Sequence, residues 1–168
     1  AKITFTAPRP SGYLLYDTFY ALPDEELYKI PGFQKDIAAS RKKAMKMLKE
    51  AGAEGLEFTY SNRSVSHPYD HLAIWLISEW KKCGLKPKMI SNPTSKFVKI
   101  RREGGFDATI DWAPSFLPDP TLMHFKYLSS DRTASNYSNY TDRVLDNIFD
   151  LQRKETDVNQ RRNLVHQF

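Results

Sequence analysis

Strand-like and helix-like segments alternate along the middle of the chain, and this order constrains the fold more than any other feature. Short runs that alternate apolar and polar side chains predict strands. Runs of good helix formers, with caps and glycine stops, fill the intervals. Strand, helix, strand connections of this kind favour a mostly parallel sheet flanked by helices, an α/β domain. The predicted strands are residues 56–60, 86–90 and 106–112, and the predicted helices are residues 36–51, 68–82 and 93–102.

The remaining segments predict a domain boundary and three further helices. Residues 1–34 are irregular and aromatic, whereas residues 35–168 carry the α/β pattern. Within this second part, a loop rich in Ser, Asn and Tyr separates one short helix from two longer ones. A chain of 168 residues is long enough to bury a core. These predicted helices are residues 121–128, 141–154 and 157–168.

The helix predicted at residues 68–82 is apolar over more than half of its circumference. A helix that is apolar on most sides is usually covered by other elements. We therefore expect this helix to be well buried. Its apolar side chains include Leu72, Ile74, Trp75, Leu76, Ile77 and Trp80.

A stiff aromatic loop follows the strand predicted at residues 106–112. Pro114, Pro118 and Pro120 cannot donate to a sheet ladder, and each disfavours helix in the residue before it. Ligands of open α/β sheets gather beyond the carboxyl ends of the strands. The loop from Trp112 to Pro120 is therefore a candidate binding surface, and a purely structural connection is the alternative. Arg63, in the polar loop expected after the first strand, would lie at the same edge and could bind a carboxylate.

The sequence lacks the motifs of several other function classes. No phosphate-binding glycine loop occurs, no nucleophile is paired with a base, and no cofactor motif is present, so an enzyme is not favoured. Cys83 is the only cysteine, and His67 precedes Pro68, so His67 and His71 make a poor metal site. The net charge of +5 is spread over helices, which favours solvated faces over nucleic-acid binding.

An ordered series of short motifs resembles a known family. Taken together, the series is similar to the second lobe of the family 5 extracellular solute-binding proteins, the dipeptide-, oligopeptide- and nickel-binding components of ABC importers. The resemblance covers roughly residues 28–168. The motifs are AMKMLKEAG at 44–52, WKKCGLK at 80–86, GGFDA at 104–108, DW at 111–112, PDP at 118–120, NYSNY at 136–140 and DxxLD at 142–146.

The resemblance implies a periplasmic-binding-protein-like lobe, without catalysis, in a two-lobe protein that closes on a solute. It further implies a monomer in the periplasm or outside the cell, with a lipid anchor as one option, that serves the membrane permease of an importer. The first lobe lies outside the matched motifs. A small stand-alone α/β enzyme and a basic nucleic-acid module are the alternatives from other classes.

The resemblance also implies ligand contacts. Arg63 aligns with an arginine that binds the terminal carboxylate of the peptide in dipeptide binders. Peptide binders carry an aspartate three residues after the tryptophan, where this chain has Ser115. The anchor for a free amino terminus is thus replaced by a neutral hydroxyl. The predicted ligand-binding residues are Arg63, Trp112, Ser115, Phe116, Asn136 and Tyr137.

Overall fold

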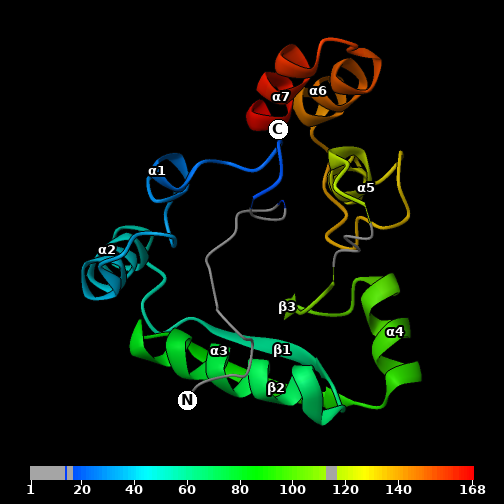
Figure 1. Ribbon diagram of the computed structural model, residues 1–168. Helices are drawn as coiled ribbons and strands as arrows, with labels where there is room; N and C mark the ends of the chain where they lie inside the picture. The colour runs from blue at the N-terminus through cyan, green and yellow to red at the C-terminus, as the bar shows by residue number, and fades with distance from the viewer. Residues whose placement is uncertain (1–13, 15–16, 113–116) are drawn as a thin grey trace. The chain divides into compact units, whose positions relative to one another are not determined.

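The computed structural model describes residue 14 and residues 17–112 and 117–168 (Figure 1). These residues form two compact units. The first unit is Ile30–Asp111, and the second joins the segment that ends at Lys29 to the described residues of Trp112–Phe168. The boundary expected between an irregular segment, 1–34, and a lobe, 35–168, stays a prediction.

A parallel sheet forms the centre of the first unit. Its strand order is β2-β1-β3, so β1 is the central strand. β1 pairs with β2 along its whole length, from Glu57 opposite Lys86 to Arg63 opposite Asn92. The predicted α/β class with parallel strands is therefore confirmed. The strands are β1 (Glu57–Arg63), β2 (Lys86–Asn92) and β3 (Ala108–Thr109).

Helices connect and flank these strands, with ends close to those predicted. The Asp36 carboxylate accepts from the Ala39 backbone N–H at 2.9 Å and so caps the first of them. Gly104 ends the last with φ of 71°, a left-handed conformation that glycine adopts without strain. The elements are α2 (Ile37–Glu50), the turn η1 (Ser66–Asp70), α3 (His71–Lys82) and α4 (Thr94–Glu103).

Only one face of α3 is covered, so the prediction that this helix is well buried is wrong. Ala73 is fully buried, and the Trp80 ring packs edge-on against Phe58 and Tyr60 at 5.3 and 5.6 Å between centroids. Ile74 and Trp75, on the other side, are 61% and 49% exposed. The sheet of this unit covers one stripe of the helix and leaves these two side chains largely exposed.

The strand predicted at residues 106–112 is much shorter in the structure. β3 contains two residues, and the segment before it is held by a side chain instead of a ladder. The Asp107 carboxylate accepts from both the backbone N–H and the hydroxyl of Thr59, each at 2.7 Å. These hydrogen bonds, first that of the hydroxyl, hold the pKa of Asp107 below its usual value.

The second unit is helical. Its long helices begin at Asp142 and Asp157, whose carboxylates accept from backbone N–H groups of the first turn. Buried side chains at its centre include Leu27, Leu128 and Phe149. The helices predicted at residues 141–154 and 157–168 are thus confirmed. The elements are α1 (Asp24–Leu27), α5 (Pro120–His124), η2 (Phe125–Tyr127), α6 (Arg143–Lys154) and α7 (Val158–Gln167).

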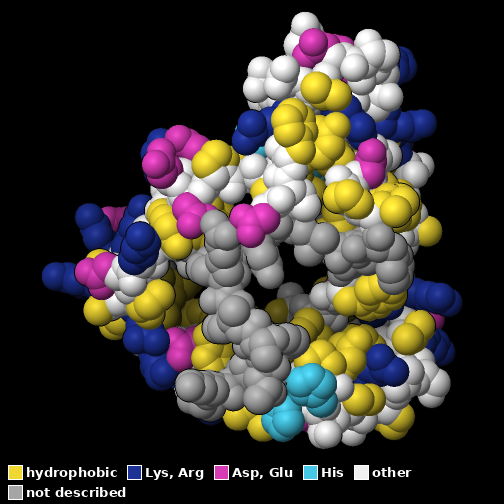
Figure 2. Space-filling model, in the orientation of Figure 1, with side chains coloured by type: hydrophobic (Ala, Val, Ile, Leu, Met, Phe, Trp, Pro, Cys, Tyr) yellow, Lys and Arg dark blue, Asp and Glu magenta, His cyan; other side chains and the backbone are white. Residues whose placement is uncertain are grey.

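Lysine side chains cover the outer face of α2, and Figure 2 shows them gathered over this helix. Lys42, Lys43, Lys46 and Lys49 are all exposed, as predicted. Across the part of the chain that the structure describes, no helix has the length and apolar character needed to cross a bilayer.

Candidate functional site

Arg63 lies at the carboxyl end of the central strand. The sequence placed it in a loop, but β1 continues through Ser61 and Asn62 to Arg63, which corrects that prediction. The polar side chains of Ser61 and Asn62 are buried, and the parallel ladder to β2 continues until the Ser64 N–H donates to the Asn92 carbonyl at 2.8 Å. The backbone of Arg63 is therefore part of the sheet and has a defined direction.

Two hydroxyl groups hold the Arg63 side chain. Its Nε–H donates to Thr94 Oγ1 at 3.0 Å, and Nη1 donates to the Tyr69 hydroxyl at 3.3 Å. The guanidinium also lies over the Tyr69 ring, 5.0 Å from its centroid. Among the described residues no carboxylate pairs with Arg63 and Nη2 has no acceptor. The half-buried cation can therefore accept an anion from outside the unit.

The surroundings of Arg63 are fixed by buried contacts. The Tyr69 ring meets the buried Phe97 ring at 6.2 Å between centroids. The Asn62 amide, fully buried beneath the strand end, donates to Asp70 at 2.7 Å. Asp70 is the acidic side chain of the turn η1, and this bond turns it toward Asn62.

Trp112 opens the proline-rich loop and belongs to the second unit. Its side chain is 56% exposed, and its carbonyl accepts from the Lys126 ammonium group. Tryptophan side chains give a binding surface a large apolar contact area and one polar N–H group. Ser115 and Phe116, the other site residues predicted on this loop, lie outside the described residues.

Asn136 and Tyr137 lie on the loop between η2 and α6. Asn136 is 8% exposed, and its amide nitrogen donates to the carbonyls of Leu128 and Tyr140 at 2.9 and 3.0 Å. These bonds tie the two ends of the loop together. Tyr137 is half-buried on the same loop. Asn136 therefore shapes the loop that presents Tyr137, and the ligand contacts of both residues stay predictions.

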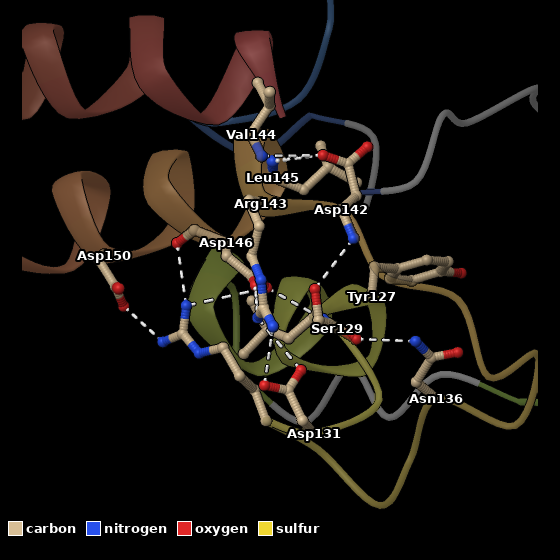
Figure 3. A network of polar contacts seen from close by, with 12 residues as sticks. Tyr127, Ser129, Asp131, Asn136, Asp142, Arg143, Val144, Leu145, Asp146 and Asp150 are labelled. Carbon is tan, nitrogen blue, oxygen red and sulfur yellow. Dashed lines mark hydrogen bonds and ion pairs between the residues drawn. The ribbon is translucent and has the colours of Figure 1, made fainter.

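A polar network around Asp146 anchors this loop to α6, as Figure 3 shows. The Asp146 carboxylate is buried, accepts from the Ser129 N–H at 2.9 Å, and pairs with Arg143 at 2.8 Å. Arg132 donates to the Asp146 carbonyl at 3.2 Å and to Asp150 at 2.7 Å. The network fixes the start of the loop on the first turns of α6.

Burial and hydrogen bonding oppose each other at Asp146. Burial would raise the pKa of this carboxyl, but the Ser129 N–H and hydroxyl and the Arg143 guanidinium together hold the pKa below its usual value. Asp146 is therefore a structural anion whose charge is satisfied within the second unit. It has no role in our proposed ligand site.

The Asp119 carboxylate also has a structural role, because its hydrogen bonds are made within the second unit. Its carboxylate caps α5 through the Thr121 N–H at 2.8 Å and accepts from Arg161 Nη2 with both oxygens at 3.0 Å. Arg161 also donates to the buried Gln152 and to the Tyr20 hydroxyl, so one guanidinium joins α5, α6, α7 and the N-terminal segment.

The two neighbouring histidines do not assemble a larger cluster. The rings of His67 and His71 lie 5.9 Å apart between centroids. In the described ranges, no group of three or more His, Cys, Asp or Glu side chains is arranged to hold a metal ion.

The predicted site residues fall on both units: Arg63 in the first, Trp112, Asn136 and Tyr137 in the second. Their grouping around one ligand stays a prediction. Sequence reasoning missed Tyr69 and Thr94, which hold Arg63. Thr94 had a usable signal, because it follows the carboxyl end of the strand that pairs with β1. Tyr69 had no such signal, because its contact with Arg63 depends on the conformation of the turn η1, which the sequence pattern does not predict.

Comparison with known sequences identifies peptide-binding relatives. No model of a protein family matches the chain. A di/tripeptide-binding protein of Pseudomonas aeruginosa is 28% identical over 139 residues, which is 79% of this chain and 26% of that protein. A dipeptide-binding protein of the same species is 26% identical over the same length. The chain thus spans about a quarter of the length of these relatives.

Several solved structures share the fold of this chain. HbpA2 of Haemophilus parasuis superposes with a TM-score of 0.67 at 26% identity, over 82% of this chain and 27% of that chain. OppA of Haemophilus influenzae, solved with the peptide RPPGFSPFR, gives 0.70 at 22% identity, over 84% and 28%. MppA, a periplasmic murein tripeptide binding protein, gives 0.70 at 21% identity, over 80% and 26%. This chain is therefore similar in sequence to di- and tripeptide-binding proteins, and it shares its fold with substrate-binding proteins of ABC transporters, as its sequence predicts.

Proposed function

We propose that this chain is the second ligand-binding lobe of a two-lobe solute-binding protein, which binds a peptide-like ligand and delivers it to the membrane permease of an importer. The protein acts without catalysis, as a monomer, in the periplasm or outside the cell, with or without a lipid anchor. Support comes from relatives that are named for binding dipeptides and tripeptides. The rest of the ligand enclosure is supplied by the remainder of such a protein.

The observation that carries the proposal is that Arg63 donates to two hydroxyl groups and to no carboxylate among the described residues. An arginine without a carboxylate partner, at the carboxyl end of the central strand, is the group that a peptide carboxylate needs. Trp112 and Phe116 would pack on the side chains of the ligand, and Ser115 and Tyr137 would add polar contacts. Asn136 would act by shaping the Tyr137 loop.

Arg63→Ala tests the proposal in the intact two-lobe protein. A library of tripeptides with free carboxylates is screened by calorimetry, and the tightest binder is titrated against both proteins. We expect the substitution to weaken binding by about 1.5–3 kcal/mol, because a charge-assisted hydrogen bond is lost. The fold should survive, because Arg63 forms no ion pair among the described residues.

Arg102→Ala is the matched control, because Arg102 is exposed on α4 and carries the same charge. It should leave the affinity unchanged. If no library member binds, or if Arg63→Ala binds as well as the unaltered protein while its thermal unfolding is unchanged, the proposal is wrong.

A second experiment concerns Ser115, which stands where peptide binders of the family carry an aspartate. A hydroxyl cannot replace the ion pair between that carboxylate and the ammonium group of a peptide. The same tripeptide, free and N-acetylated, should therefore bind the intact protein with affinities within about tenfold, or 1.4 kcal/mol. A stronger preference for the free amine would mean that another carboxylate of the protein has taken over this role.

The two alternatives from other classes have less support. The relatives are named as binding proteins, so a stand-alone enzyme is not our choice. The lysines of α2 are exposed along one helix. The helix has no aromatic side chain on which nucleic-acid bases could stack. Binding to DNA that weakens steeply with salt would favour the nucleic-acid alternative.

A further inference from the structure

We propose that the hydroxyl groups of Tyr69 and Thr94 are direct ligand contacts and form, together with Arg63, a cradle for one carboxylate. This inference rests on the proposed function, because it concerns the same ligand. It adds two residues that neither the sequence pattern nor the similar proteins assign. It also specifies the chemical class that the cradle selects, a free carboxylate over its neutral amide.

The argument starts from the direction of two hydrogen bonds. Arg63 has only donors, so both hydroxyls act as acceptors toward it, at 3.0 Å for Thr94 and 3.3 Å for Tyr69. Each hydroxyl still carries one hydrogen of its own, which needs an acceptor elsewhere. The described residues provide no acceptor for either hydrogen. Two O–H donors therefore flank Arg63, one beside its Nε and one beside its Nη1.

The charge of the cradle determines what it can accept. Arg63 contributes a full positive charge, and no carboxylate among the described residues pairs with it. Asp70, on the same turn as Tyr69, is occupied by the buried Asn62 amide. A cluster that presents only donors and a positive charge favours an anion with several acceptor lone pairs, which a carboxylate supplies.

Both hydroxyls are held in place before a ligand arrives. The Tyr69 ring lies under the guanidinium, 5.0 Å from it, and meets the Phe97 ring edge-on. Phe97 is 2% exposed, so the core of the first unit supports the Tyr69 ring. Thr94 is the first residue of α4, directly after the carboxyl end of β2. Groups fixed in this way lose little freedom on binding, which improves affinity.

The test uses Tyr69→Phe and Thr94→Val in the intact protein. Each change removes a hydroxyl and keeps the shape of the side chain. The tightest tripeptide from the library is titrated as the free acid and as its C-terminal amide. Each variant should bind the free acid about three- to tenfold more weakly, the usual effect of one hydrogen bond. The amide should change by less than about twofold, because it already lacks the charge.

Ser95→Ala serves as the matched control, because Ser95 follows Thr94 on α4, is exposed, and is not one of the two residues whose hydroxyls accept from Arg63. The informative quantity is the ratio of free-acid to amide affinity, which a general loss of stability would not change. Equal losses for both ligand forms, or no loss in either variant while Arg63→Ala still loses the free acid, would overturn the cradle and leave the proposed function intact. If Arg63→Ala itself keeps the ratio unchanged, the proposed carboxylate site is wrong.

Discussion

Replacing Asp146 with alanine should lower the free energy of unfolding of the second unit by about 3 kcal/mol. The substitution removes the acceptor of the buried Ser129 N–H and the partner of Arg143. Ser129 is fully buried, so its N–H would be left without water or protein as an acceptor. Urea denaturation, followed by circular dichroism and by hydrogen exchange of α6 peptides, measures the loss.

Asp150→Ala is a demanding control, because Asp150 lies one turn further along α6 and binds the same Arg132. Its side chain is 42% exposed, so this pair should contribute no more than about 1 kcal/mol. Equal losses for the two variants would show that burial of Asp146 does not set the strength of the network. Loss of exchange protection in the loop after Ser129 should accompany Asp146→Ala only.

Acidification from pH 7.5 to 5 should destabilise the second unit by about 2 kcal/mol through His124 alone. This side chain ends α5, is 2% exposed, and stacks on Phe168 with 4.0 Å between ring centroids. Burial, and next the charge of Arg161, lower its pKa from 6.5 to about 4, against the opposing effect of Asp119. Between pH 6.5 and about 4, His124 is protonated in the unfolded chain and neutral in the folded chain.

The direction of the effect follows from that difference. Stability is complete above the unfolded pKa of 6.5, falls as the pH drops toward about 4, and loses nothing more from this group below it. His124→Gln should remove most of this slope, whatever its effect on stability at neutral pH. His71→Gln, on the exposed start of α3, should keep the slope. Unfolding free energies measured in urea at several pH values decide between these outcomes.

The local pattern of the sequence predicted most helices and strands of both units. Asp36 and Gly104 define helix ends by capping and by left-handed geometry, and both effects act within a few residues. Alternating side chains located β1 and β2 for the same reason. Parallel pairing followed from the connections, because a helix between two strands leaves few alternatives. The strand order β2-β1-β3 was not predicted.

Contacts between distant residues were beyond this kind of reasoning. Asn62 looked like a loop residue, because nothing local shows that Asp70 would satisfy its buried amide. The segment before β3 is held by the hydrogen bonds between Asp107 and Thr59, which are 48 residues apart in the chain. Ile74 on α3 looked like a core residue because the helix is apolar on most sides. Its exposure in the structure depends on packing between elements, which the local sequence does not show. For the carboxylate contact, the sequence analysis proposed Arg63 but did not name Tyr69 and Thr94, which hold it.

The order of the strands has a consequence for how the first unit assembles. Closing a chain segment costs entropy that grows with its length. Glu57 and Lys86, at the start of the β1–β2 ladder, are 29 residues apart, whereas Thr59 and Asp107 are 48 apart. We expect β1, α3 and β2 to form the folding nucleus, because their pairing closes the shorter segment over a long ladder. β3 then joins late, and the two hydrogen bonds of Asp107 fasten the last strand to a sheet that already exists.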